Sequence, residues 1–299
     1  MDREDYLKAG RVAGEVREMV RRRDWIGRTV YEVCEWVEAE IRSRGAGCAF
    51  PVNTSINEVA AHYTAEPDDA RTIDSGDLVK VDLGAHVNGY IADTAVTVSY
   101  DDRHDALVSA AEDALDRAMR MCRVGTKASQ IGKAIEGVIK GAGFRPIANL
   151  SGHSLDRYTI HAGKTIPNIW SFGGFSLSGQ SAYACEPFCT YKDGGGFVRN
   201  GAVKNIFALN SRKRTKDERA DRMADYIWDT FNSLPFALRW LTGEFGDAAH
   251  GLLDHLVSKK VVKAYPVLVE THGKVVAQAE HTFIPGENGP VITTAWNGG

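Results

Sequence analysis

Two aspartates interrupt a stretch that otherwise has the pattern of a β-hairpin, KVDLGAHVNGYIADTAVTV over residues 80–98. Asn88 and Gly89 at its centre predict a two-residue turn, and that turn fixes the register of both strands. The expected pairs are Val87 with Tyr90, Asp82 with Ala95, and Gly84 with Asp93. Asp82 and Asp93 then share one face as diagonal neighbours, with Cβ atoms about 7 to 8 Å apart. Because aspartate is rare in strands and costly to bury, the pair predicts either a bound cation or a face open to solvent.

Two glutamates stand in similarly unusual places. Glu186 lies in YACEPF and Glu280 in VVAQAEHTF, and both segments are otherwise suited to burial. Four carboxylates converging in a cleft of low dielectric would repel one another, whereas two divalent cations would neutralise them. Oxygen ligands with one imidazole suit Mn, Fe(II), Co or Zn, and they do not suit a structural thiolate zinc site. The residues therefore indicate a two-metal centre that can polarise a peptide carbonyl and activate water.

Three histidines are candidates to join these carboxylates. His62 lies in NTSINEVAAHYT and His161 in SLDRYTIHAG, while His153 follows Gly152 in the polar segment NLSGHSL, which is typical of a loop. From the residues alone, buried histidines bonded to the backbone remain the alternative for all three.

The composition excludes several classes of protein. The chain has 299 residues, 43% of them hydrophobic, and a formal net charge of −3, so it lacks the basic field of a nucleic-acid binder. The first residues, MDREDYLKAGR, show no signal peptide, and no apolar run approaches the roughly 18 residues of a membrane span. Five cysteines without a CxxC motif fit a reducing compartment. We expect a cytoplasmic protein with no membrane partner and no specific nucleic-acid partner.

The helices come in two similar pairs. Amphipathic patterns predict helices over residues 3–22 and 29–41, and Thr29 and Glu32 have the spacing of a capping box. The same pattern of apolar residues and glycines is repeated about 98 residues later. The apolar residues Val33, Val37 and Ile41 match Ile131, Ile135 and Ile139, and the glycines Gly27 and Gly45 match Gly125 and Gly143. An internal duplication therefore predicts two pseudo-symmetric halves, with His62 in one and His161 in the other.

Residues 200–264 differ in character from the rest. They contain the basic stretch SRKRTKDER and the helical patterns DERADRMADYIWDTF and DAAHGLLDHLVSKK. We interpret the basic stretch as the solvated start of a helix, with an RNA contact as the alternative. The segment is predicted to be a mostly helical insertion in a mixed sheet.

Several segments resemble those of methionine aminopeptidases. KVDLGAHVNGYIADTAVTV, NLSGHSLDRYTIHAGK, YACEPF and AQAEHTF resemble that family's metal-ligand segments, and FPVNTSINEVAAHYT is similar to its substrate-side histidine segment. The resemblance covers nearly the whole chain. It implies the pita-bread fold, an α+β architecture in which two pseudo-symmetric halves enclose a central antiparallel sheet.

The long segment between Glu186 and Glu280 is similar to the insertion of the archaeal kind of type II enzyme. This likeness implies that residues 1–199 and 265–299 form the catalytic domain. Residues 200–264 would then form the helical insertion subdomain.

The resemblance also implies a role for each candidate residue. Asp82 would chelate one of two divalent ions, Asp93 and Glu280 would bridge both, and His153 and Glu186 would complete the second site. Glu186 resembles the family's proton shuttle, while His62 and His161 would bind the substrate beside the scissile bond and take part in catalysis. The implied methionine pocket consists of Phe50, Ile160, Phe188, Tyr265 and Leu268. The alternative is that these five are ordinary core residues.

The implied function is removal of the initiator methionine from nascent polypeptides whose second residue is small, by a monomer that contacts the ribosome transiently. One alternative is a proline-specific peptidase of the same fold. Such enzymes usually have a separate amino-terminal domain, and the roughly 80 residues before Asp82 leave no room for one. Another is a non-catalytic protein of this fold that binds the ribosome or RNA and has lost its metal ligands. The motifs G-x-S-x-G, GxxxxGK[ST] and HExxH are absent, so serine hydrolases and phosphate-loop enzymes have no support.

Overall fold

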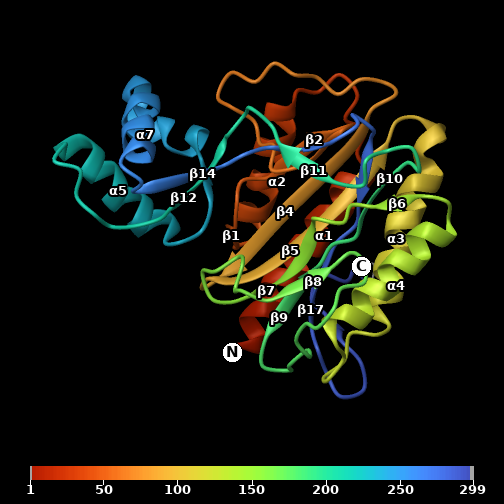
Figure 1. The fold of residues 1–299 in the computed structure, drawn as a ribbon. Helices are drawn as coiled ribbons and strands as arrows, with labels where there is room; N and C mark the ends of the chain where they lie inside the picture. Colours follow the sequence, from red (N-terminus) through yellow and green to blue (C-terminus); the bar gives the residue numbers. More distant parts are fainter. Residues whose placement is uncertain (1, 297–299) are drawn as a thin grey trace.

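Two helix-and-strand halves lie side by side in the computed structural model, which describes residues 2–296 (Figure 1). The first half contains α1 (Arg3–Arg22), α2 (Val30–Ser43), β1 (Gly47–Cys48), β2 (Asn53–Ile56), β3 (Val59–Ala61), β4 (Leu78–Val87) and β5 (Tyr90–Ser99). The second half contains α3 (Asp105–Met119), α4 (Ala128–Gly141), β6 (Arg145–Pro146), β7 (Ser151–Leu155), β8 (Thr165–Pro167), β9 (Ala182–Cys185) and β10 (Phe188–Thr190). After residue 264 the chain returns to the halves with β15 (Leu268–Glu270), β16 (Val276–Gln278), β17 (His281–Ile284) and β18 (Val291–Ile292).

Both predicted helices begin at a capping residue, of which the sequence indicated the one at Thr29. Asp2 accepts from the backbone N–H groups of Glu4 and Asp5 at the start of α1, and Thr29 and Glu32 form the capping box of α2. Such caps satisfy amide donors that would otherwise lack partners in the first turn. Both helix predictions are confirmed, with α2 running two residues past the expected end.

The two halves make equivalent backbone hydrogen bonds, as the predicted duplication implies. Gly27 N donates to Ile73 O at 2.8 Å, and its counterpart Gly125 N donates to Leu177 O at 2.9 Å. The four matched glycines all lie in the left-handed region, with φ of 76° at Gly27, 78° at Gly45, 83° at Gly125 and 89° at Gly143. Each half also has its own apolar core, α1 and α2 packing on β2, β4 and β5, and α3 and α4 packing on strands of the second half.

The ladders between these strands are antiparallel throughout residues 2–296. β4 and β5 have the predicted register, pairing Val87 with Tyr90, Asp82 with Ala95, and Gly84 with Asp93. In the second half the strand order is β18-β17-β9-β7-β8. The expected hairpin and the α+β class are both confirmed.

One local expectation is wrong, because His153 lies in a strand and not in a loop. β7, which contains it, pairs with β8 on one side and with β9 on the other. Gly152 suggested a loop, but the structure gives another reason for a glycine at this position. A Cβ there would clash with the carbonyl oxygen of Ala184 in β9. Close approach of two backbones requires glycine there, and the ladder overrides the polar local sequence.

Residues 200–264 project to one side of the halves (Figure 1). Besides α5 (Glu218–Phe231), α6 (Thr242–Phe245) and α7 (Ala249–Ser258), the segment contains β12 (Ile206–Leu209), β13 (Phe236–Ala237) and most of β14 (Val262–Tyr265). These strands form a small sheet in the order β13-β12-β14, which the sequence patterns did not predict. A separate apolar cluster lies within residues 207–262. The division of the chain at residues 200 and 264 stays a prediction.

Among residues 2–296, no helix combines the length and the apolar character that crossing a membrane would require.

Helix α1 packs tightly on the last part of the described chain, where a Cβ at Gly10 would clash with the carbonyl oxygen of Thr293. We therefore expect Gly10→Ala to lower the free energy of unfolding by about 1–3 kcal/mol, since backbone atoms must move. At Gly137 in α4, an added Cβ would meet no atom within 4 Å beyond the backbone of its own helix. As the matched control, Gly137→Ala should raise stability by about 0.5–1 kcal/mol through helix propensity. Denaturant unfolding of both variants tests this, and equal stability would contradict the close approach.

Candidate metal centre

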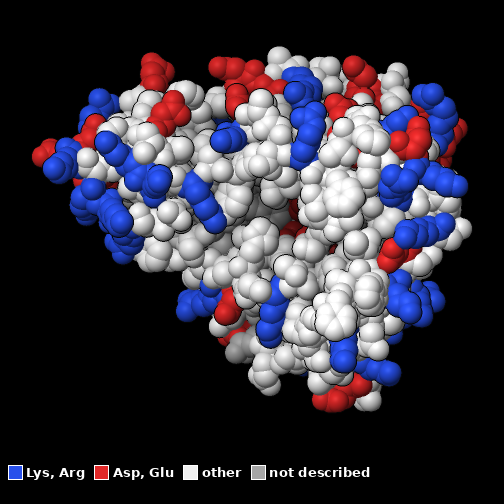
Figure 2. Space-filling view, in the orientation of Figure 1, with Lys and Arg blue, Asp and Glu red and all other residues white. Residues whose placement is uncertain are grey.

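The predicted site residues all line one cavity of about 340 Å³. They are Phe50, His62, Asp82, Asp93, His153, Ile160, His161, Glu186, Phe188, Tyr265, Leu268 and Glu280. Figure 2 shows a hollow near the middle of this face of the molecule, with acidic side chains visible at its floor. The size and the mixture of apolar walls with a few polar groups are typical of a small-ligand pocket.

Five strands or strand ends bring the candidate ligands together. Asp82 lies in β4, Asp93 in β5 and His153 in β7. Glu186 directly follows β9, and Glu280 lies between β16 and β17. The two aspartates come from the first half and the other three residues from the second half or the closing strands, so the centre forms only where the halves meet.

The side chains are close enough to share cations. His153 Nε2 lies 3.6 Å from Asp93 Oδ2 and 3.5 Å from Glu186 Oε1. Ligand atoms of Asp93, His153 and Glu280 all lie within 4.8 Å of one another. Carboxylate and imidazole donors at such spacing are the ligand types that Mn, Fe(II), Co and Zn accept in catalytic sites.

The electrostatics of the carboxylates call for positive charge. Burial raises the pKa of Asp82 to about 7. Burial and then the neighbouring charges of Asp82 and Glu186 raise the pKa of Asp93 well above its usual range, and burial followed by Asp93 does the same for Glu280. Within residues 2–296, Asp82 Oδ1 and Asp93 Oδ1 are buried without a hydrogen-bond partner. Since buried oxygens of this kind are normally satisfied, the residues fit divalent cations.

Neutral imidazoles complete the polar wall. Burial, and then the charge of His161, lowers the pKa of His62 to about 4 and that of His153 to about 3. The rings of His153 and His161 meet edge to face with centroids 4.4 Å apart, and His62 lies against Tyr265 at 6.1 Å. A neutral His153 keeps a nitrogen lone pair for a metal, and neutral His62 and His161 can each donate one N–H.

The apolar side of the cavity is formed by the residues predicted for the methionine pocket. Phe50 is buried against β4, where its ring lies so close to Gly84 that a Cβ there would clash. Phe188 is also buried, while Ile160, Tyr265 and Leu268 are partly exposed to the cavity. Whether they bind methionine stays a prediction of the sequence resemblance.

Sequence reasoning missed Gln278, which contacts two of the candidate ligands. Its Nε2 atom donates to Asp82 Oδ2 and to Glu280 Oε2, each at 3.3 Å. The side chain is buried. Its position two residues before Glu280 is the signal that could have found it, because alternate residues of an extended chain share a face. Gln278 orients carboxylates in the manner of outer-shell partners at metal sites.

Comparison with known proteins now decides the family. The sequence model of metallopeptidase family M24 matches residues 4–204. The chain belongs to metallopeptidase family M24. As a member of this family it uses divalent metal, in agreement with the cluster of Asp93, His153 and Glu280.

Individual relatives agree with the family assignment. The chain is 42% identical to the methionine aminopeptidase of Thermococcus onnurineus, over 98% of this M24 chain and 99% of that protein. Among solved structures, a thermophilic Arx1 matches with a TM-score of 0.80 and 20% identity, covering 98% of this chain and 91% of that one. The methionine aminopeptidase of Thermotoga maritima matches with a TM-score of 0.70 and 22% identity, covering 98% and 96%. The pita-bread fold and the resemblance seen in the sequence are confirmed.

The raised pKa of Asp82 predicts a pH dependence for the metal-free M24 protein. The folded chain holds a proton on this carboxyl up to about pH 7, whereas the unfolded chain releases it near the ordinary value of 3.8. The unfolding free energy of the wild type should therefore fall, relative to that of Asp82→Asn, as pH rises from about 4 to about 7. Denaturant titrations in chelator measure this difference. A difference that stays constant with pH would show that Asp82 ionises normally.

Proposed function

We infer that the chain is a metallo-aminopeptidase that removes N-terminal methionine, and we propose that its substrates are nascent polypeptides whose second residue is small. The observation that carries this inference is the convergence of five carboxylate and imidazole side chains at the floor of a cavity with apolar walls. Relatives matching the chain along almost its whole length are named methionine aminopeptidases.

The proposed metal ligands are the five residues that the sequence indicated. In this proposal Asp82 would hold one divalent ion, Asp93 and Glu280 would contribute to both, and His153 and Glu186 would hold the second. Support comes from the unpartnered buried oxygens of Asp82 and Asp93 and from the short distances around His153 Nε2. Co, Mn, Fe(II) and Zn all suit these donors. When bound, the ions supply Lewis acidity for the scissile carbonyl and lower the pKa of water.

The protein's own side chains supply proton transfer and binding of the substrate oxygen. Burial, followed by the charge of Asp82, raises the pKa of Glu186 well above its usual range. In the cavity, Glu186 Oε1 lies 3.5 Å from His153 Nε2, and we assign this carboxyl group to protonation of the leaving amine. His62 and His161 are neutral and face the cavity, so either N–H can stabilise the oxyanion that develops on the carbonyl oxygen.

Substrate selection follows from the two unlike sides of the cavity. The proposed pocket for the methionine side chain consists of Phe50, Ile160, Phe188, Tyr265 and Leu268. In this proposal the residue after methionine would lie beside the carboxylates of the cavity floor, where a small side chain would be favoured. We therefore propose a requirement for a small second residue.

The remaining assignments concern the setting of the enzyme. We propose that it acts in the cytoplasm as a monomer, that it contacts the ribosome transiently, and that residues 200–264 are the helical insertion of a type II enzyme. The proline-specific alternative has less support because the full-length relatives are named methionine aminopeptidases. The non-catalytic alternative has less support because all five proposed ligands are present.

A peptide panel tests the proposed substrate preference. Chelated protein resupplied with Mn, Fe(II) or Co should release methionine from Met-Ala-Ser and leave Met-Lys-Ser and Ala-Pro intact, as measured by quantifying free amino acids. Cleavage of Ala-Pro would support the proline-specific alternative. No cleavage with any metal would support the non-catalytic one.

Replacement of the proposed proton shuttle tests the mechanism. Glu186→Gln should reduce kcat by at least about a hundredfold, because an amide cannot relay a proton. Glu136→Gln on α4 is the matched control, since that carboxylate bonds Lys140 on the surface. Thermal unfolding and metal titration of both variants verify folding and metal binding. A wild-type rate in Glu186→Gln would remove this residue from the mechanism.

A further inference from the structure

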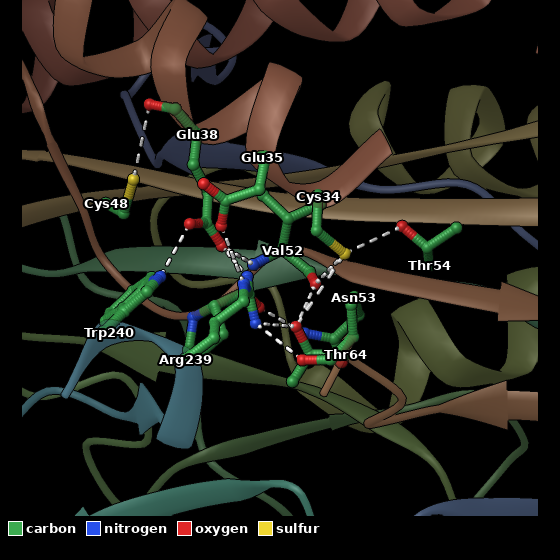
Figure 3. A network of polar contacts seen from close by, with 12 residues as sticks. Cys34, Glu35, Glu38, Cys48, Val52, Asn53, Thr54, Thr64, Arg239 and Trp240 are labelled. Atoms are coloured by element: carbon green, nitrogen blue, oxygen red, sulfur yellow. Dashed lines mark hydrogen bonds and ion pairs between the residues drawn. The ribbon is translucent and has the colours of Figure 1, made fainter. Parts of the chain in front are cut away.

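Segment 200–264 inserts one arginine into the interior of the first half (Figure 3). Arg239 follows β13 in the short turn Leu238–Trp240, and its side chain is 2% exposed. It forms an ion pair with Glu38 of α2, whose side chain is 0% exposed. Burying both charges is expensive unless each is fully paired and hydrogen-bonded, so the pair calls for an explanation beyond stability.

The guanidinium of Arg239 bonds to two different parts of the first half. On one side it donates through Nε to Glu35 Oε1 at 3.1 Å and through Nη2 to Glu38 Oε1. On the other side Nη1 donates to Thr64 Oγ1 at 2.8 Å and to Ala65 O at 3.1 Å. Arg239 thereby ties the segment that follows β3 to helix α2 (Figure 3).

Thr64 is held by residues 200–264 at each of its polar groups. Its N–H donates to Asn205 Oδ1 at 3.5 Å, and its carbonyl accepts from Asn205 Nδ2. Its hydroxyl accepts from Arg239 and donates to Val52 O at 2.7 Å. Thr64 and Asn205 are both buried. The backbone at residue 64 is therefore fixed by contacts from a segment more than a hundred residues away in sequence.

His62, which faces the cavity, lies two residues before this anchor. Its φ of 64° is in the left-handed region, which is strained for any residue other than glycine. Such a conformation persists only where the surrounding structure enforces it. Its N–H donates to Asn53 Oδ1 at 2.9 Å, and Thr54 N donates to Tyr63 O at 2.8 Å. Glu38, the partner of Arg239, accepts from Val52 N at 3.1 Å. Both ends of the buried ion pair thus restrain the chain around His62.

We propose that Arg239 is a positioning residue that holds the His62 imidazole at the cavity wall by clamping Thr64. The proposal rests on the proposed function only for the role of His62 as the group that contacts substrate. Segment 200–264 is then a part of the catalytic apparatus, because it supplies the clamp. A displacement of about 1 Å in such a group is enough to reduce a rate a hundredfold.

Two substitutions that each weaken one contact of Arg239 separate positioning from simple anchoring. Thr64→Val keeps the shape of the side chain and removes the hydroxyl beside His62. Glu35→Gln, the matched control, weakens the partly exposed ion pair on α2 and leaves the His62 segment untouched. On Met-Ala-Ser we expect kcat to fall about tenfold in Thr64→Val and to stay unchanged in Glu35→Gln. Equal effects of the two substitutions on kcat would overturn the proposal.

A double-mutant cycle tests whether the effect passes through His62. Arg239→Lys keeps the charge opposite Glu38 and loses the fork that reaches Thr64, so it should repeat the tenfold loss. In a His62→Ala background, neither Thr64→Val nor Arg239→Lys should reduce kcat further, because the group being positioned is gone. Losses that multiply in that background would show that Arg239 does not act through His62.

A crystal structure of Thr64→Val supplies a readout independent of turnover. We expect His62 to leave the left-handed region or to turn its ring away from Tyr265. An unchanged His62 would overturn the proposal even if the wild type proved inactive on every peptide. Inactivity of the wild type with a displaced His62 would instead contradict the proposed function alone.

Discussion

The convergence of four carboxylates in one buried cavity is the constraint on which the rest of the structure depends. Burial raises the pKa values of Asp82, Asp93, Glu186 and Glu280, with mutual repulsion adding to the effect in the last three, and two of their oxygens have no hydrogen-bond partner in the described part of the chain. Such an arrangement is unfavourable in a protein without a cation, so the fold must supply enough packing around it to offset the repulsion. The paired apolar cores on the outer sides of the strands supply that packing.

The duplicated architecture explains how so many polar groups reach one place. Strand β5 of the first half contacts β9 and β17 where the halves meet, while the helices of each half pack on that half's strands. Residues at this junction line one cavity. His62 and His161, equivalent in the duplication, both line the cavity but differ in what holds them: His62 is restrained through Asn53 and Thr64, and His161 lies against His153. Residues 200–264 break the symmetry, because Arg239 and Asn205 hold Thr64 beside His62, whereas on the other side Ser233 Oγ donates to Tyr158 O at 2.6 Å.

The parts that sequence predicted well are those determined over short distances along the chain. The Asn88-Gly89 turn fixed the hairpin register, and the capping box of α2 fixed the start of that helix. Carboxylates in otherwise apolar strands indicated candidate ligands without any knowledge of the fold, and these residues line one cavity. His153 was placed in a loop because its neighbours are polar, whereas its strand depends on ladders with β8 and β9. Gln278, Arg239 and the small sheet of residues 200–264 likewise depend on partners distant in sequence, which local patterns do not contain.

The order of the ligands along the chain has a consequence for how the protein matures. Asp82 and Asp93 are synthesised early, but Glu280 lies just before β17, and the residues that follow β17 pack against α1. During synthesis the first hairpin therefore exists for a long interval as an acidic, partly formed surface without its counterpart. Cation affinity should appear late and abruptly, when the carboxyl-terminal strands dock between the two halves. With the proposed set of ligands, metal uptake would mark completed folding, and a truncated or stalled chain would not become a premature peptidase.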